Sequence, residues 1–523
     1  MAGFLRPCMT SLKQLENGVK LKIDESEVNF KAILLSSTCD LPARACVCSM
    51  NQYNGSCSCI KCKQTGKVVK VGKGSTRVFP PDMDNLVGPA RTDESVCADA
   101  LAVTQLKSPV DGIKGPSWFS YLKFYSFVNG TAIDYMHGVL LGVTKSLQAL
   151  WFSTKYSAQG FSISKQIDVV NKCLLQIKPP NYMSRLPRSL SDSKYLKASQ
   201  WKHWLLYFAP AVLYGILLPE YYSNFLLLSE AVFLLLQDSV SLEDVNRSRL
   251  MLARFVAIFP TMYTEAKMTL NVHQLLHLPD QVLNLGPMWS VSCFPFEDAN
   301  GFLLQLFNGT QHVDKHIAHA IAVIQKIPEL MPAIEKNTPA HDLYNRIKRK
   351  CLKHKGSFLE NGVYLVGASK MVNDLSCSFR CAITDKLGSP IGRIISFKRA
   401  NILGDIFHSK AYTRVRLRNS YTVSFEEDNA VLCGFIEIFL QVSIECQCMG
   451  KCYCTPTHFA MIRNLPVLEN HRGISYLKKV CETSQDKISA VPLKKIRRKC
   501  VFIDVTESNL KLVCTVPNII EKD

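Results

Sequence analysis

The chain has 523 residues, of which 47% are hydrophobic and 20% charged, so its composition is that of a globular protein of two to four domains and not of a disordered one. Its 62 basic residues outnumber its 43 acidic residues, which gives a formal net charge of +19. This surplus favours a phosphate-rich partner such as DNA, although a surface that is merely rich in lysine would give the same total.

The first residues, MAGFLRPCMTSLKQLENG, contain no apolar core of a signal peptide, so we expect no secretion. The strongest apolar runs, 205–219 and 225–237, are too short to cross a bilayer and contain Pro210 and Glu230, which indicates buried helices and no membrane contact. The 21 cysteines are therefore expected to be reduced thiols or metal ligands in a nuclear or cytoplasmic protein.

Two extended runs, 19–23 and 28–38, flank an acidic turn and predict a hairpin. Asp40 follows the second run, and Pro42 favours a helix that begins at Ala43. Asp40 thus stands at the tip of a strand, where it is either a functional carboxylate or the N-cap of this helix.

The segment 60–81 contains no acidic residue and predicts a basic hairpin or loop beside the cysteines. Its cationic side chains are candidates for contacts with nucleic-acid phosphates: Lys61, Lys63, Lys67, Lys70, Lys73 and Arg77.

Helical spacing begins at 132–150, with Asp134 near its start, and dominates from about 160 to 280. The strongest helical patterns are 198–215, 220–237 and 241–259, and the last of these begins with Ser241 three residues before Asp244, as in a capping box. Beyond about residue 350, short β-type runs separated by turn residues predict a β-rich module, for which a small barrel is one architecture.

Cys59 and Cys62 form a C-x-x-C motif, which can supply two ligands of a tetrahedral zinc site. His273 and His277 lie four residues apart on a predicted helix and would project from one face, so they are the candidates for the other two ligands. Either pair alone could be a core or surface feature. However, Asp40 precedes Cys59 by 19 residues and Glu297 follows His277 by 20, so a zinc ion would fix two carboxylates relative to each other.

Two further clusters lie near the C-terminus. Cys446, Cys448, Cys452 and Cys454 could bind a second metal ion, although their spacing is tighter than in a usual zinc ribbon and buried or redox-sensitive thiols are the alternative. The basic run KKIRRK, residues 494–499, is typical of a nuclear-import signal, a phosphate-binding patch or an exposed surface.

Five segments carry a resemblance to a known family, in this order: CDLPARACVCSMNQYNGSCSCIKC, DYMHGVLLGV, HWLLYFAP, NVHQLLHLPD and GPMWSVSCFPFEDANG. They resemble Tnp2-type transposases of CACTA (En/Spm) elements, within the wider CACTA/Mirage/Chapaev group. The resemblance runs from about Phe4 to Gln311 and depends on the combined order of D-L-P-A, C-x-x-C, D-x-x-H, H-x-x-x-H and F-E.

The resemblance implies an RNase H-like fold with a helical insertion before the last catalytic carboxylate. Such enzymes cut and join DNA with two Mg²⁺ or Mn²⁺ ions held by three acidic residues. By position, Asp40 matches the second acid and Glu297 the third, while Asp134 and His137 match a motif that supports the active site. Cys59, Cys62, His273 and His277 match structural Zn²⁺ ligands, and DNA and a second copy of the chain in a homodimer are the implied partners, with no small-molecule cofactor.

One element of the family pattern is not matched. The first catalytic Asp of the family lies on a strand upstream of D-L-P-A, whereas only 39 residues precede Asp40 here and they are typical of a helix and a hairpin. We therefore expect an α/β chain that lacks the first strand of the core. The expected parts are a truncated RNase H-like core with the zinc half-site (1–150), a helical insertion (151–280), a return to the core with the last carboxylate (281–345) and a β-rich module (350–523).

These patterns leave three functions open. The first is a transposon-derived, DNA-binding protein with impaired catalysis. The second is an active DNA transposase whose N-terminal part is missing from this chain. The third is a protein-interaction scaffold that does not bind DNA.

Overall fold

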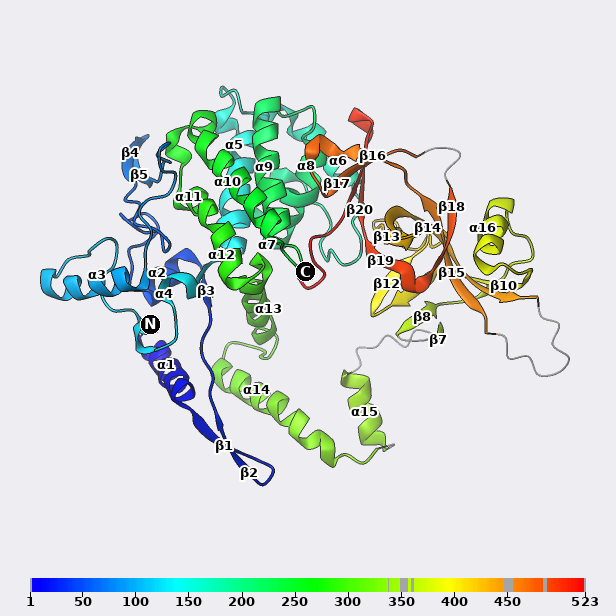
Figure 1. The fold of residues 1–523 in the computed structure, drawn as a ribbon, viewed down its shortest axis with the longest axis horizontal. Coiled ribbons are helices and arrows are strands. Elements are labelled where there is room, and N and C mark those ends of the chain that lie inside the picture. Colours follow the sequence, from blue (N-terminus) through cyan, green and yellow to red (C-terminus); the bar gives the residue numbers. More distant parts are fainter. Residues whose placement is uncertain are drawn as a thin grey trace. The chain divides into compact units, whose positions relative to one another are not determined.

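The structure is a computed structural model, and it describes residues 2–336, 338–348, 356–358, 362–445, 455–482 and 487–521. The chain folds into two compact units. The first comprises Met1–Cys293, Leu468–Lys479 and Val501–Asp523, and the second comprises Phe294–Val467 and Val480–Cys500. Helices and several sheets occur among the described residues, so the predicted mixed α/β class and β-rich C-terminal region are confirmed (Figure 1). The predicted second metal cluster, Cys446, Cys448, Cys452 and Cys454, lies outside the described residues.

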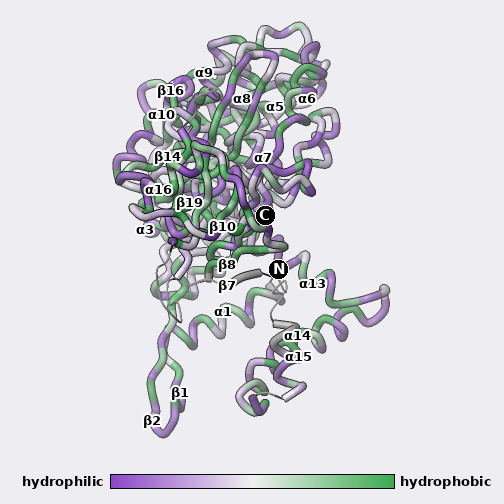
Figure 2. Tube along the Cα trace, turned by 90° about the vertical axis from the view of Figure 1, so that its right-hand side faces the viewer, coloured by the Kyte–Doolittle hydropathy of each residue, from purple (hydrophilic) through white to green (hydrophobic). Residues whose placement is uncertain are grey.

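The first unit begins with α1 (Ala2–Asn17) and a hairpin of β1 (Val19–Ile23) and β2 (Ser26–Phe30). The two strands pair antiparallel from Val19↔Phe30 to Ile23↔Ser26, as predicted. Polar and apolar residues are mixed along both strands (Figure 2), and most of their side chains are exposed. Asp24 makes the turn with a φ of 53°, a conformation that Asp tolerates better than most residues.

The run predicted over 28–38 is not one strand. It divides into β2 and a separate short strand, β3 (Ser37–Cys39), because β3 pairs with a strand almost 100 residues later. That strand is β6 (Thr131–Ile133), and the pair is parallel, with Ser37 opposite Thr131 and Cys39 opposite Ile133. Since the carboxyl ends of parallel strands meet at one edge, the residues that follow them, Asp40 and Asp134, are placed at the same edge.

Between these strands lie α2 (Leu41–Val47), the hairpin β4 (Lys67–Val71) and β5 (Gly74–Val78), and α3 (Asp93–Leu106). The hairpin confirms the predicted basic β-hairpin beside the cysteines.

Helices fill the rest of the first unit from Met136 to Leu285 (Figure 1). A π-helical segment, Met136–Thr144, continues into α5 (Lys145–Phe152). The others are α6 (Ile167–Gln176), α7 (Ala198–His203), α8 (Ala209–Val212), α9 (Pro219–Leu235), α10 (Leu242–Tyr263), α11 (Leu270–Gln274) and α12 (Leu278–Leu285). Ser241 accepts a hydrogen bond from the Asp244 amide at 3.1 Å, so the predicted N-terminus of α10 is confirmed. In the described part of the chain, no helix combines the length and apolar character that a membrane span requires.

Four strands from the end of the chain return to the first unit: β16 (Val467–Asn470), β17 (Leu477–Val480), β20 (Val501–Val505) and β21 (Leu510–Cys514), in the antiparallel order β16-β17-β21-β20. Tyr476, just before β17, stacks on Phe233 of α9 with ring centroids 3.8 Å apart, and its hydroxyl lies 2.7 Å from that of Ser229. This sheet is therefore packed on the helical layer, and the C-terminal strands are shared between the two units.

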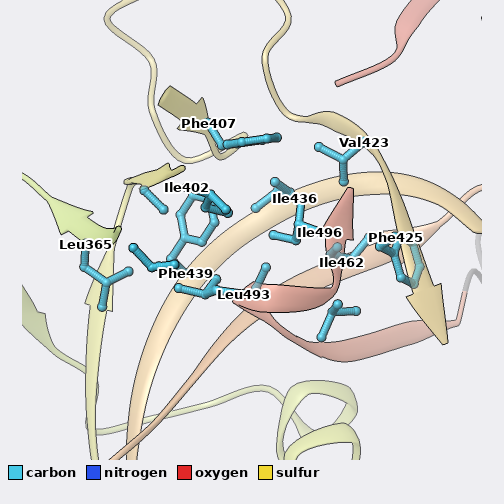
Figure 3. Close-up of a cluster of buried hydrophobic side chains, with 14 of the residues drawn as sticks. Leu365, Ile402, Phe407, Val423, Phe425, Ile436, Phe439, Ile462, Leu493 and Ile496 are labelled. Atoms are coloured by element: carbon cyan, nitrogen blue, oxygen red, sulfur yellow. The ribbon is translucent and has the colours of Figure 1, made fainter. Parts of the chain in front are cut away.

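The core of the second unit lies between two sheets. In the larger sheet the long strand β14 (Ala430–Ile444) pairs with β10 (Ile391–Phe397), β13 (Thr422–Glu427) and β15 (Thr457–Asn464). The smaller sheet contains β8 (Val363–Val366), β11 (Arg399–Ile402) and β12 (Asp405–His408). Figure 3 shows side chains of both sheets in one cluster, among them Leu365, Ile402, Phe407, Phe425 and Phe439.

The second unit also contains the helices α13 (Phe294–Leu303), α14 (Val313–Leu330), α15 (Pro339–Lys348) and α16 (Cys377–Leu387). Large apolar side chains of α14 are exposed, including Ile324 and Leu330.

Candidate metal centre and adjoining polar clusters

Cys59, Cys62, His273 and His277 come together in the first unit, and their ligand atoms all lie within 4.8 Å of one another. The Cys62 sulfur is 3.2 Å from Nε2 of His273, which is 3.3 Å from Nε2 of His277. All four residues are buried. Two thiols and two imidazoles that converge on one point in a water-poor site could hold a metal ion, and this donor set suits tetrahedral Zn²⁺.

One unpaired atom also fits a metal site. Nδ1 of His273 is buried and has no hydrogen-bond partner, whereas buried polar atoms are nearly always paired. A histidine whose Nε2 binds a metal usually donates from its other ring nitrogen, so Nδ1 would carry the proton when Nε2 binds a metal.

Arg91 holds the cysteine loop in place, and a backbone hydrogen bond joins the segment after β5 to the segment just before the histidines. The buried guanidinium of Arg91 donates to the carbonyl oxygens of Cys57 at 2.6 Å and of Cys59 at 2.9 Å. The amide of Phe79, just after β5, donates to the carbonyl of Met268, just before α11, at 2.7 Å. Leu270 and Phe79 pack with the two cysteines in a small apolar cluster. The segments are thus held together by the protein itself.

The two thiols differ in acidity. Burial raises the pKa of Cys59, but the hydrogen bond with Cys62 and the charges of His277 and His273 outweigh burial and lower that pKa well below its usual value. The hydrogen bond with Cys59, together with burial, raises the pKa of Cys62. Each of the two thiols therefore strongly affects the acidity of the other.

Asp40 is the N-cap of α2. Its Oδ1 accepts a hydrogen bond from the amide of Ala43 at 2.8 Å, and the residue is half-buried. Of the two interpretations that the sequence left open, capping is thus realised, and it leaves Oδ2 outside the capping bond.

Asp134 and His137 form a close pair at the end of β6. Oδ2 of Asp134 lies 2.6 Å from Nδ1 of His137 and accepts the His137 amide at 2.9 Å. Its Oδ1 accepts the amides of Met136 at 3.3 Å and of Cys293 at 2.9 Å. With four hydrogen bonds the carboxylate of Asp134 is saturated, so it anchors its neighbours.

Cys293 completes this cluster, and no local motif distinguishes it from the other residues in a chain with 21 cysteines. Hydrogen bonds with Asp134 and with Cys293 raise the pKa of His137 to about 10. Burial raises the pKa of the Cys293 thiol, whose sulfur lies 3.7 Å from the hydroxyl of Thr38 in β3. His137 is therefore a cation at neutral pH, and it is held beside strand β3 and strand β6.

Glu297 lies in α13 of the second unit and its side chain is exposed. Asp40, by contrast, belongs to the first unit.

The predicted phosphate-binding cations fall into two groups. Lys61 donates to the carbonyls of Val128 at 2.6 Å and Thr131 at 2.9 Å, and burial lowers its pKa to about 8. Lys63 pairs with Asp99 and Asp111, Lys67 pairs with Glu265, and Arg77 donates to the carbonyl of Thr65. Lys70 and Lys73, at the tip of the β4–β5 hairpin, are exposed. Lys61 and Lys63 therefore hold the fold together, and the hairpin tip presents cations to solvent.

The basic run KKIRRK is part of the second unit. It covers Lys494 and Lys495, which are exposed, and β19 (Ile496–Lys499), in which Ile496 and Lys499 are buried. Four of the six residues of this motif are thus part of a sheet.

Comparisons were made with protein-family models and with curated protein sequences. No family model matches this chain, and no curated protein sequence matches it.

Proposed function

We propose that this chain derives from a CACTA-type DDE DNA transposase and acts as a zinc-stapled, RNase H-like, nucleic-acid-binding protein with impaired strand cleavage. The observation that carries the proposal is the convergence of Cys59 and Cys62 with His273 and His277. The spacing within each pair predicted these four ligands, although the two pairs lie more than 200 residues apart. The order of the motifs around them resembles that of the transposases.

The parallel pairing of β3 and β6 supports the RNase H-like part of the proposal. In such a core, acidic residues follow adjacent parallel strands, and Asp40 and Asp134 do so here. The remaining strands of that sheet have no counterpart among the described residues of the first unit, which fits a reduced core.

The net charge of +19 and the exposed lysines of the β4–β5 hairpin support nucleic-acid binding. Phosphate groups are bound by cations that reach solvent, so Lys70 and Lys73 are the best candidates for these contacts.

The carboxylates support impaired catalysis. Mg²⁺ or Mn²⁺ ions that activate water need several carboxylate oxygens that are not already engaged. In the described part of the first unit, both oxygens of Asp134 accept two hydrogen bonds each and one oxygen of Asp40 caps α2. This donor set does not fit a metal pair, and we derive no catalytic step from it.

A strand-cleavage assay with Mg²⁺ or Mn²⁺ tests the catalytic part. We expect the wild type to cleave a DNA substrate no faster than Asp40→Asn, a variant that keeps the helix cap because Asn caps as well as Asp. Asp82→Asn, in an exposed loop, is the matched control. If the wild type and Asp82→Asn cleave and Asp40→Asn does not, the protein is an active transposase instead.

The salt dependence of DNA affinity tests the binding part. Phosphate contacts make log Kd vary steeply with log salt, and Lys70→Gln/Lys73→Gln should reduce that slope by roughly 2. Lys494→Gln/Lys495→Gln is a control with the same charge change in the second unit. The wild type failing to bind DNA at low salt would favour the protein-interaction scaffold.

A DNA-binding role places the protein in the nucleus. Because only part of KKIRRK is exposed, we expect Lys494→Gln/Lys495→Gln to reduce nuclear accumulation of a fluorescent fusion, with Lys70→Gln/Lys73→Gln as the control.

A further inference from the structure

The carboxylate of Glu521 is buried in the first unit and is surrounded by hydrogen-bond donors. Its side chain is 9% exposed, and it accepts hydrogen bonds from the hydroxyl of Tyr135 and, at 3.3 Å, from the hydroxyl of Ser292. Its Oε2 lies 3.4 Å from Nζ of Lys202, whose side chain is 10% exposed. A buried ammonium is stable only when an anion accompanies it, so Glu521 and these three donors form a polar pocket that holds a negative charge.

The pocket adjoins the polar cluster at the end of β6. Tyr135 directly follows Asp134, and Ser292 directly precedes Cys293. Lys202 comes from α7, so three segments of the first unit each supply one donor. The pocket and the Asp134–His137 cluster are thus connected through neighbouring residues of the chain.

The segment that carries Glu521 is held mainly through polar contacts. The carbonyl of Pro517 accepts the Asp238 amide at 3.2 Å, and Nδ2 of Asn518 donates to the carbonyl of Leu236 at 2.8 Å. By contrast, Ile519 and Ile520 are 55% and 57% exposed. Val516 and Pro517 are buried and anchor the chain before this point, whereas the last residues, from Ile519 to Glu521, bury no apolar side chain, so these last residues can be displaced at low cost in free energy while the rest of the unit stays folded.

We propose that Tyr135, Lys202 and Ser292 form a binding pocket for a phosphate group, and that Glu521 occupies it as an internal, displaceable plug. Two hydroxyl donors and one ammonium are a donor set that phosphate oxygens accept as readily as a carboxylate does. The source of the phosphate, a nucleic-acid backbone, rests on the proposed function. In this form the chain inhibits its own binding of nucleic acid until the segment leaves.

The test uses the full chain and two probes, a short DNA duplex and inorganic phosphate. Glu521→Ala empties the pocket, and Glu521→Ala/Lys202→Met also removes its cation. Glu507→Ala is the matched control, because Glu507 precedes the same C-terminal segment but pairs with Lys172 outside the pocket. DNA affinity is measured by fluorescence anisotropy, and phosphate binding by the rise in melting temperature.

We expect Glu521→Ala to bind DNA roughly tenfold more tightly than the wild type, because a plug that fills the pocket most of the time lowers the apparent affinity by the fraction that is open. Phosphate should stabilise Glu521→Ala more than the wild type, in which it must first displace Glu521, and the double variant should lose both gains. Equal DNA affinity and equal response to phosphate in Glu521→Ala and the wild type would overturn the proposal.

Two further outcomes are distinct. If no variant binds DNA but phosphate stabilises Glu521→Ala alone, the pocket stands and the proposed function fails. If Glu521→Ala does not fold, hydrogen exchange of the wild type tests the proposal instead. Phosphate should accelerate exchange of the Ile519 and Glu521 amides, and unchanged exchange would overturn the proposal that phosphate displaces Glu521.

Discussion

Cys59 and Cys62 are buried so close together that two thiolates would repel each other, and a bound metal ion would remove this repulsion. Their proximity favours one thiolate and one thiol, because a second negative charge in a buried site is costly. A zinc ion, as proposed, would compensate both charges and bind both sulfurs as thiolates, with the two imidazoles as neutral ligands. The free energy of binding then becomes part of the free energy of folding.

Cys62→Ser should therefore lose the metal and unfold more easily. We expect about one zinc ion per wild-type chain and none in the variant, with a loss of more than roughly 3 kcal/mol in the free energy of unfolding. Metal analysis and thermal unfolding measure both quantities. Cys57→Ser, a buried cysteine of the same loop outside the cluster, should keep the metal; a Cys62→Ser protein that retains zinc would contradict the assignment.

The Asp134–His137 pair should make stability depend on pH on the alkaline side. The folded-state pKa of His137, about 10, lies above the ordinary value of about 6.5, so its stabilising contribution is complete below pH 6.5 and is lost as the pH rises through 10. The melting temperature of the wild type should fall between pH 7 and 10 more than that of His137→Gln. His319→Gln, on the exposed face of α14, should behave like the wild type; equal slopes for all three proteins would contradict the pairing.

At the scale of elements, the short parallel pair β3–β6 is completed by a side chain. Gln281 of α12 is buried, accepts the amide of Ile133 at 2.6 Å and donates to the carbonyl of the same residue at 3.0 Å. The side-chain amide thus satisfies the edge of β6 as a neighbouring strand would. It also links the helical layer to the strand that carries Asp134.

Gln281→Leu should be strongly destabilising for this reason. Leucine has a similar size but leaves a buried N–H and a buried C=O of Ile133 unpaired, each at a cost of about 1–3 kcal/mol. Chemical denaturation should show a total loss of roughly 2–5 kcal/mol. Asn284 is exposed on the same helix, so Asn284→Leu should change the free energy of unfolding little. A similar loss for both variants would show that the pairing of Gln281 with Ile133 does not contribute to stability.

At the scale of the whole molecule, the candidate metal centre lies in the unit that is built from the most separated stretches of sequence, and a bound metal would stabilise that unit. The first unit is built from three stretches of chain, and its candidate metal site joins residues 211 positions apart. Closing a loop of this length in the unfolded chain is entropically costly, and a metal clip removes much of that freedom. The second unit has its own apolar core between two sheets and contains no metal-ligand cluster among its described residues.

Calorimetry should therefore resolve two unfolding transitions, of which a metal chelator lowers only one. Phe439→Ala in the core of the second unit should lower the temperature of the other transition alone, because it reduces the free energy of unfolding of that unit by about 3–5 kcal/mol. Limited proteolysis at each step would identify the unit that unfolds. A single transition that both treatments lower equally would show that the units unfold together.

Local patterns in the sequence predicted the features that depend on neighbouring residues. The hairpins β1–β2 and β4–β5 follow from alternation and turn residues, and the start of α10 follows from Ser241. The Cys–His set was also predictable, because each half has its own local spacing and the coordination chemistry of zinc requires that two such halves meet.

Only the tertiary structure decided which distant groups share a site. Cys293 beside His137, Gln281 on β6 and Glu521 in its pocket are common residue types without a local motif. Their roles depend on the return of the chain after tens to hundreds of residues. The sequence by itself therefore determined the class of the fold and the donors of a metal site, whereas packing decided the polar environment, because burial and long-range pairing are set by the folded chain and not by spacing along it.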